Sequence, residues 1–293
     1  MPTQQMAPPD ARDRKPFDDE IDVYGLTHTG KMRPDNQDHF LICALRKQMV
    51  VYQTSLPDPL HLASGPERLA FLAMVADGVG GGAKGEEASR TALEAVTEYV
   101  AGTMRCYYAA GSADDQEFTD SLQEAALRCS AEVKRRGETE PDYRGMATTL
   151  TLFLGAWPKA YLLQVGDSRC YFYRDGELRQ ITRDQTMAQE LVDSGILSRA
   201  DAAGTRLAHT LSSSIGGRMT DPVVTRFDMA WGAVLLLCSD GLTGHVSDER
   251  IRQRLAAMTS AKQVCEDLLR DALDGGGSDN VTIIVGRALP RAG

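Results

Sequence analysis

The stretch "LAFLAMVADGVGGGAKGEE", residues 69–87, joins an apolar run to an aspartate and a glycine-rich loop. Residues 69–76 have the length and apolar content of a buried strand, and Asp77 follows this run directly. Alanines at helical spacing begin soon after Glu86. The stretch therefore predicts a strand, a loop and a helix. Either the glycines bind a nucleotide's phosphates, or the aspartate is the functional group, or the loop is a simple turn.

The nucleotide interpretation fails on specific residues. Gly78 to Ala83 fit G-x-G-x-x-G/A, but a dinucleotide site needs a second strand that ends in an acid about twenty residues on. That distance falls in "TEYVAG", residues 97–102, which continues the helical pattern. In the P-loop pattern, Ala83 replaces the second glycine and Gly85 replaces the hydroxyl residue that would hold magnesium.

Aspartates recur at the ends of apolar runs. Asp77, Asp167 and Asp240 each end such a run, Asp279 begins one, and Asp38 comes just before another. One such aspartate alone is usually a turn former. Several of them at one edge of a sheet would repel one another and need cations. Oxygen ligands favour Mg²⁺ or Mn²⁺, and no His-x-x-x-His or Cys-x-x-Cys spacing supports zinc.

Paired hard cations suit attack on phosphorus, because they activate water and stabilise charge on the transferred group. Gly78 has no side chain, so its carbonyl could reach a metal beside Asp77. Arg33 is the candidate for holding phosphate oxygens, although alone it would be read as a solvated surface arginine. A serine hydrolase is disfavoured, because "GDSRC" lacks the final glycine of G-x-S-x-G.

Short strands joined by tight turns, with helices inserted in two places, favour an α+β domain over alternating β-α-β units. The Asp175-Gly176 pair predicts a hairpin, and serines at 247 and 260 predict helix starts, the second with a Gln263 capping box. Predicted strands are 21–29, 40–44, 49–53, 69–76, 148–154, 160–165, 170–174, 177–181, 223–227, 234–238 and 281–285. Predicted helices include 86–100 and 119–136.

One domain over 21–289 is the simplest organisation, with residues 1–20 as a disordered tail, 46–68 as an irregular excursion and 183–217 as a surface flap. The net charge of −9 argues against nucleic acid as a partner. No apolar run is long enough to span a membrane. Six scattered cysteines, several in apolar runs, favour reduced thiols and a cytoplasmic protein.

Six ordered motifs carry a family resemblance over roughly residues 22–287: "RPDNQD", "VADGVGG", "GMATTL", "VGDSR", "CSDGL" and "GGGSDNVT". Together they resemble the protein phosphatase 2C (PPM) family, and its bacterial members most of all. The resemblance implies a central β-sandwich of two antiparallel sheets flanked by helices. It also implies hydrolysis of phosphoserine and phosphothreonine in proteins by a metal-bridging water, with Mg²⁺ or Mn²⁺ as cofactor.

The resemblance assigns metal ligands residue by residue. Asp77 would bridge two ions, with the Gly78 carbonyl on one of them. Asp240 and Asp279 match the remaining direct carboxylate ligands, and Asp167 matches the ligand of a third, weaker ion.

Three further residues match supporting positions, and three depart from the family pattern. Arg33 matches the phosphate-binding arginine, Asp38 a residue that orients metal-bound waters, and Asn280 a supporting hydrogen-bonding residue. Val79 stands where animal members carry a histidine proposed as general acid. Gln37 replaces the usual glutamate of the first motif, which removes one negative charge, and Ala147 replaces a common glycine of the third motif.

We therefore expect a monomeric protein-serine/threonine phosphatase that acts on phosphorylated proteins and reverses a bacterial Ser/Thr kinase. The alternative is a catalytically silent module that keeps the fold to bind partners. A nucleotide-binding protein is a distant third.

Overall fold

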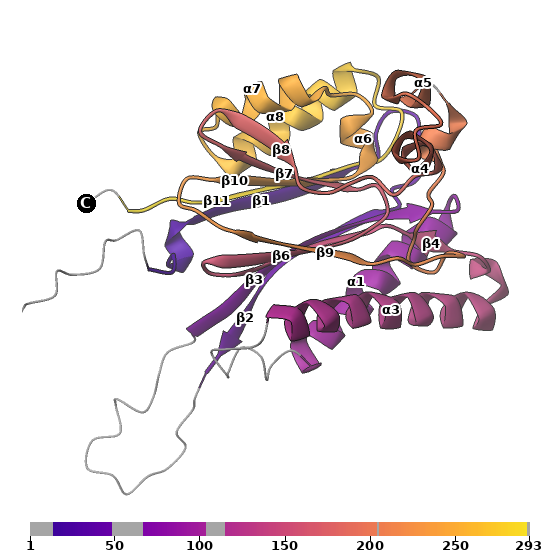
Figure 1. The fold of residues 1–293 in the computed structure, drawn as a ribbon, viewed down its shortest axis with the longest axis horizontal. Helices are drawn as coiled ribbons and strands as arrows, with labels where there is room; N and C mark the ends of the chain where they lie inside the picture. The colour runs from indigo at the N-terminus through magenta and orange to yellow at the C-terminus, as the bar shows by residue number, and fades with distance from the viewer. Residues whose placement is uncertain (1–13, 49–66, 104–114, 204, 292–293) are drawn as a thin grey trace, which may run out of the picture.

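The computed structural model describes residues 14–48, 67–103, 115–203 and 205–291. Two antiparallel sheets lie face to face, and helices cover the outer face of each (Figure 1). The predicted α+β sandwich with flanking helices is confirmed.

The first sheet has strand order β1-β11-β10-β7-β8, and every neighbouring pair runs antiparallel. Its strands are β1 (Ile21–His28), β7 (Arg169–Arg174), β8 (Glu177–Gln180), β10 (Val234–Cys238) and β11 (Val281–Ala288). The predicted hairpin joins β7 to β8, and Asp175 takes a positive φ of 52° in its turn.

The second sheet has order β2-β3-β5-β6-β9, with the short strand β4 attached to β3. Its strands are β2 (Asp38–Lys47), β3 (Glu67–Val79), β4 (Ala147–Thr148), β5 (Leu150–Ala156), β6 (Lys159–Val165) and β9 (Val223–Asp228). The opening stretch therefore contributes a central strand, which runs past Ala76 and carries Asp77 within it.

Strand β3 is apolar over residues 69–76 because both of its faces are buried there. Met74 packs in the cluster beneath the helices, whereas the next residue, Val75, packs between the two sheets with Leu237 and Ile284. Side chains alternate faces along a strand, so burial on both sides produces an unbroken apolar run.

Helices cover the two outer faces in pairs. Helices α1 (Ala83–Thr103) and α3 (Asp115–Thr139) pack on the second sheet, and α7 (Asp248–Ala256) and α8 (Ala261–Asp274) on the first (Figure 1). As predicted, Ser247 and Ser260 cap α7 and α8 by accepting backbone N–H bonds. The predicted capping box differs in one bond, because the Gln263 side chain accepts from the N–H of Thr259.

The predicted flap contains two short helices, α4 (Met187–Asp193) and α5 (Arg199–Ala203), at one end of the sandwich (Figure 1). Helix α6 (Asp240–Thr243) is a single turn after β10. None of the helices in the described part of the chain is long and apolar enough to cross a bilayer.

The structure describes only part of the predicted tail, residues 1–20, and of the predicted 46–68 excursion. The strand predicted at 49–53 lies outside the described residues, as does most of the 46–68 excursion. Residues 14–20 are ordered although the sequence assigns them to the tail: Arg14 pairs with the buried Glu20, Nη2 to Oε1, at 2.5 Å. The domain therefore begins before residue 20.

Candidate metal centre

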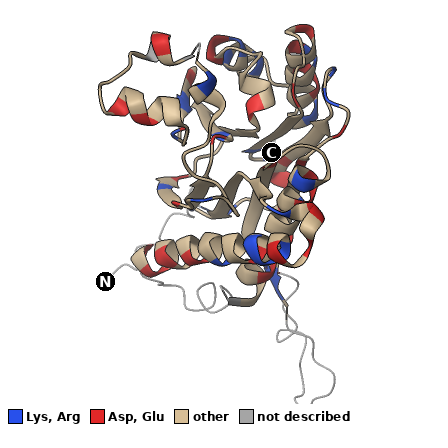
Figure 2. Cartoon of the chain, turned by 90° about the vertical axis from the view of Figure 1, so that its right-hand side faces the viewer, with Lys and Arg blue, Asp and Glu red and all other residues tan. Residues whose placement is uncertain are grey.

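Four of the five predicted aspartates line one cleft of about 530 Å³ at an edge of the two sheets. Asp77, Asp167, Asp240 and Asp279 reach it from four different chain segments. Arg33, Gly78 and Asn280 line the same cleft. Figure 2 shows the molecule from the end that carries the flap. The flap contributes residues to this cleft. In the described residues, no three Asp, Glu, His or Cys side chains stand in a ready-made coordination arrangement.

Asp38, the fifth aspartate, lies behind the cleft as the first residue of β2. Antiparallel pairing places it directly opposite Asp77. Its Oδ2 accepts hydrogen bonds from the hydroxyls of Ser239 and Thr282, each at 2.7 Å. Its Oδ1 is buried and has no hydrogen-bond partner. A buried acceptor left in this state suits a bound water or a cation.

Two threonines hold the backbone of Asp77, and sequence analysis missed both. The Asp77 N–H donates to Thr149 Oγ1 at 3.0 Å, and Thr148 Oγ1 donates to the Asp77 carbonyl at 2.8 Å. The Thr149 N–H donates to the same carbonyl at 2.9 Å. The side chain of Asp77 is thus carried on a backbone fixed from both sides.

Burial and mutual repulsion raise the pKa values of three carboxylates in the cleft. Burial raises the pKa of Asp77 well above its usual range, and repulsion from Asp38, Asp240, Asp167 and Asp279 adds to the effect. Burial, followed by repulsion from Asp279, likewise raises the pKa of Asp240. The pKa of Asp167 is raised to about 8, first by burial and then by Asp240.

These observations fit divalent metal ions. Several carboxylates in one cleft and a buried oxygen without a partner match the preference of Mg²⁺ and Mn²⁺ for oxygen ligands.

Without metal, the protein should lose stability as pH rises from about 4 to about 8. Burial raises the pKa of Asp38 to about 7 and that of Asp167 to about 8. The folded state therefore holds these protons more tightly than the unfolded chain, so their contribution is complete below about pH 4 and is lost through pH 7–8. We expect Tm in EDTA to fall by about 5 °C or more over this range. Mn²⁺ should reverse the loss, whereas a Tm that rises steadily with pH in EDTA would contradict the repulsion.

Arg33 and Asn280 organise the Asp279 side of the cleft. Arg33 Nη2 lies 2.6 Å from Asp279 Oδ2, and this hydrogen bond raises the pKa of the arginine. Asn280 is buried and donates to the carbonyls of Thr29 and Asp35, while its Oδ1 accepts from the Gln37 N–H, all at 2.9 Å. It therefore ties the loop that carries Arg33 to the strand that follows Asp279.

Gln37 spans the glycine loop. In the amide orientation that satisfies both polar atoms, Nε2 donates to the Gly78 carbonyl at 3.2 Å and Oε1 accepts from the Gly82 N–H at 3.0 Å. A glutamate could make only the second of these bonds, because it is acceptor-only when ionised. The sequence alone suggests that Gln37 removes a charge. In the fold, its side chain bridges the glycine loop.

Glycines permit close backbone contacts in the cleft walls. A Cβ on Gly78 would lie 2.1 Å from the Gly85 carbonyl oxygen, and one on Gly241 would lie 1.9 Å from the Asn280 carbonyl oxygen. Val79 lines the cleft and is 41% exposed. His209, on the flap, lines it too, and sequence analysis did not single it out.

We expect Gly241→Ala to destabilise the protein by about 2 kcal/mol or more, because the new Cβ must displace backbone beside Asp279. Gly102→Ala is the matched control, since it is also helical and a Cβ there meets nothing within 4 Å. The control should be neutral or stabilising by about 0.5–1 kcal/mol. Urea unfolding of the two variants measures the difference, and equal stabilities would refute the contact.

The comparisons identify the class of protein to which this fold and cleft belong. Residues 53–274 match the family model described as "Protein phosphatase 2C". The chain therefore belongs to the protein phosphatase 2C family.

Among similar proteins is the serine/threonine protein phosphatase PstP of Mycobacterium tuberculosis. It is 38% identical over 219 residues, which are 74% of this chain and 40% of PstP. The chain thus spans well under two thirds of this relative. The serine/threonine phosphatase stp of Listeria monocytogenes is 30% identical over 217 residues, 73% of this chain and 83% of stp.

A solved structure shares the fold over almost the whole chain. It is the catalytic domain of PstP in complex with two manganese ions, with a TM-score of 0.69 and 30% identity. The match covers 92% of this chain and 99% of that one.

Proposed function

We propose that this chain is a Mg²⁺/Mn²⁺-dependent protein-serine/threonine phosphatase. The observation that carries the proposal is the cleft in which four aspartates and Arg33 converge. Family membership and a relative solved with two manganese ions support it.

In this proposal Asp77, the Gly78 carbonyl, Asp240 and Asp279 hold two ions, and Asp167 holds a third. Bound ions of this kind supply a water nucleophile at neutral pH and offset charge on phosphoryl oxygens. Asp38 accepts a hydrogen bond from bound water at its unpartnered oxygen. Arg33 binds phosphate oxygens, and Asn280 fixes the loop that carries it.

The substrates we propose are phosphorylated proteins, among them a Ser/Thr kinase and its targets, with the enzyme acting as a monomer. We also propose a cytoplasmic location, which is supported by five free cysteines among the described residues.

Activity toward p-nitrophenyl phosphate and toward matched phosphoserine, phosphothreonine and phosphotyrosine peptides tests the proposal. Turnover should require Mn²⁺ or Mg²⁺, stop in EDTA and favour the first two peptides. Turnover that persists in EDTA would overturn the metal-dependent assignment.

The relatives named as phosphatases, one of them solved with two manganese ions, speak against the catalytically silent module that the sequence left as an alternative. Calorimetric titration with Mn²⁺ separates the two, because the phosphatase must bind the ion. A chain that neither binds Mn²⁺ nor hydrolyses any of these substrates would be such a module.

A further inference from the structure

A second cavity, of about 100 Å³, lies between the two sheets at the end away from the aspartates. Strand β3 lines it with Phe71 and Ala73, which precede Asp77 on the same strand. At about 3.3 Å per residue, Phe71 lies about 20 Å along the strand from Asp77. The cavity is thus separate from the metal centre.

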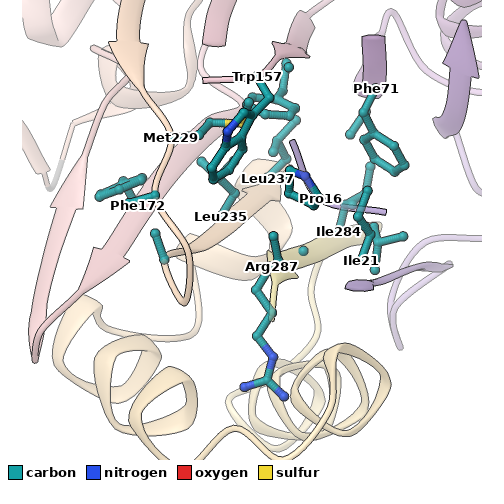
Figure 3. Close-up of a pocket in the computed structure, with 18 of the residues that line it drawn as sticks. Pro16, Ile21, Phe71, Trp157, Phe172, Met229, Leu235, Leu237, Ile284 and Arg287 are labelled. Atoms are coloured by element: carbon teal, nitrogen blue, oxygen red, sulfur yellow. The ribbon is translucent and has the colours of Figure 1, made fainter. Parts of the chain in front are cut away.

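Its walls are apolar and come from both sheets. Figure 3 shows Phe71, Trp157, Phe172, Leu235 and Ile284 around the cavity. Small residues leave the space open, since Ala73, Gly155 and Ala233 line it beside these larger side chains. Protein interiors are otherwise close-packed, and an apolar cavity of this order stays dry and accepts small apolar molecules.

Three basic residues also line the cavity, and two of them are already engaged. The guanidinium of Arg287 points away from the apolar cluster (Figure 3) and bonds Asp22 and the Thr259 carbonyl. The guanidinium of Arg68 bonds Asp18 and the Pro16 carbonyl. Neither guanidinium is free to bind a ligand in the cavity.

Lys15 differs from both. Within residues 14–48, 67–103, 115–203 and 205–291, no carboxylate forms an ion pair with it. Burial, followed by repulsion from Arg68, lowers the pKa of its ammonium, and Glu67 and Asp18, which form no ion pair with it, partly offset this. A positive charge beside an apolar chamber, with no carboxylate in direct contact, favours an anion.

We propose that this cavity binds a small monocarboxylate, with its short alkyl tail between the sheets and its carboxylate on Lys15. An amine of the same length would meet repulsion from Lys15. A neutral alcohol would fill the chamber but form no ion pair with the ammonium. The volume is below that of the roughly 150 Å³ cavity known to hold benzene, which sets the tail at about four to six carbons.

Hexanoate is the probe, and Trp157 in the cavity wall is the reporter. Titration in EDTA, at constant ionic strength, should give saturable quenching of tryptophan fluorescence. 1-Hexanol should bind at least about tenfold more weakly, and hexylamine and tetradecanoate should not saturate. Equal binding of hexanoate and hexanol would overturn the carboxylate assignment, and saturation by tetradecanoate would assign the cavity to long acyl chains instead.

Two variants locate the site. Lys15→Gln should weaken hexanoate about tenfold and leave hexanol unchanged, whereas Lys134→Gln on α3 should change neither. Ala73→Val should abolish binding of both by filling the chamber, with Ala233→Val as the substitute if the first variant melts early. Hexanoate binding that survives Lys15→Gln and both filling variants overturns the proposal. These measurements need neither metal nor phosphatase activity, so their result is independent of the proposed function.

Discussion

Asp77→Asn should lower kcat/KM toward a phosphoserine peptide by about 10³-fold, because Asp77 is the carboxylate proposed to bridge both ions. The same change should raise the Tm of the metal-free protein. Asp77 is the aspartate repelled by all four others, and an amide removes that repulsion. Lost activity together with gained stability is the signature of a residue that is retained for a bound cation.

The matched control is Asp175→Asn in the β7–β8 turn, where the aspartate side chain is 86% exposed. Asparagine suits the positive φ of this residue, so activity and Tm should stay at the values of the unsubstituted protein. Melting curves in EDTA and in Mn²⁺ complete the comparison. An Asp77→Asn protein that is still stabilised by Mn²⁺ to the normal extent would place the ions elsewhere.

Arg33→Ala should lower kcat/KM by about 10²-fold, since a bidentate guanidinium contact with phosphate oxygens is lost. Arg33→Lys should recover only part of this, because an ammonium cannot form the planar fork. The affinity of Arg33→Ala for Mn²⁺ should stay the same or increase, because the guanidinium of Arg33 no longer occupies Asp279 Oδ2.

The Mn²⁺ titration decides what Arg33 does. If Arg33→Ala loses Mn²⁺ affinity in proportion to activity, the arginine positions Asp279 and does not bind phosphate. Arg174→Ala, at an exposed arginine in the β7–β8 hairpin, is the control for general loss of positive charge.

The fold class and the gathering of the aspartates could be predicted because both leave local signals. An apolar run buried on both faces is visible in residues 69–76, and carboxylates at strand ends are visible one by one. The partners of these residues leave no such signal. The hydroxyls of Ser239 and Thr282 meet Asp38 only because β2, β10 and β11 converge from distant parts of the chain.

The role of Gln37 and the presence of the inter-sheet cavity could not be predicted from the sequence either, because both depend on residues that are distant along the chain. The amide of Gln37 looked like a missing charge until the Gly78 carbonyl and the Gly82 N–H were placed on either side of it. The cavity forms because side chains from the two sheets do not fill the space between them. The hydrophobic pattern of a single strand does not predict such a volume.

The pairing of β2 with β3 bears on how this protein can diversify. The rows from Asp38 opposite Asp77 to Leu45 opposite Ala70 are continuous, and the register shifts only between Leu45 and Arg46. The chain that connects the two strands lies beyond this irregularity, at the opposite end of the pairing from Asp38 and Asp77. We therefore expect that this connection can be lengthened, shortened or replaced by a recognition module while the aspartates keep their places.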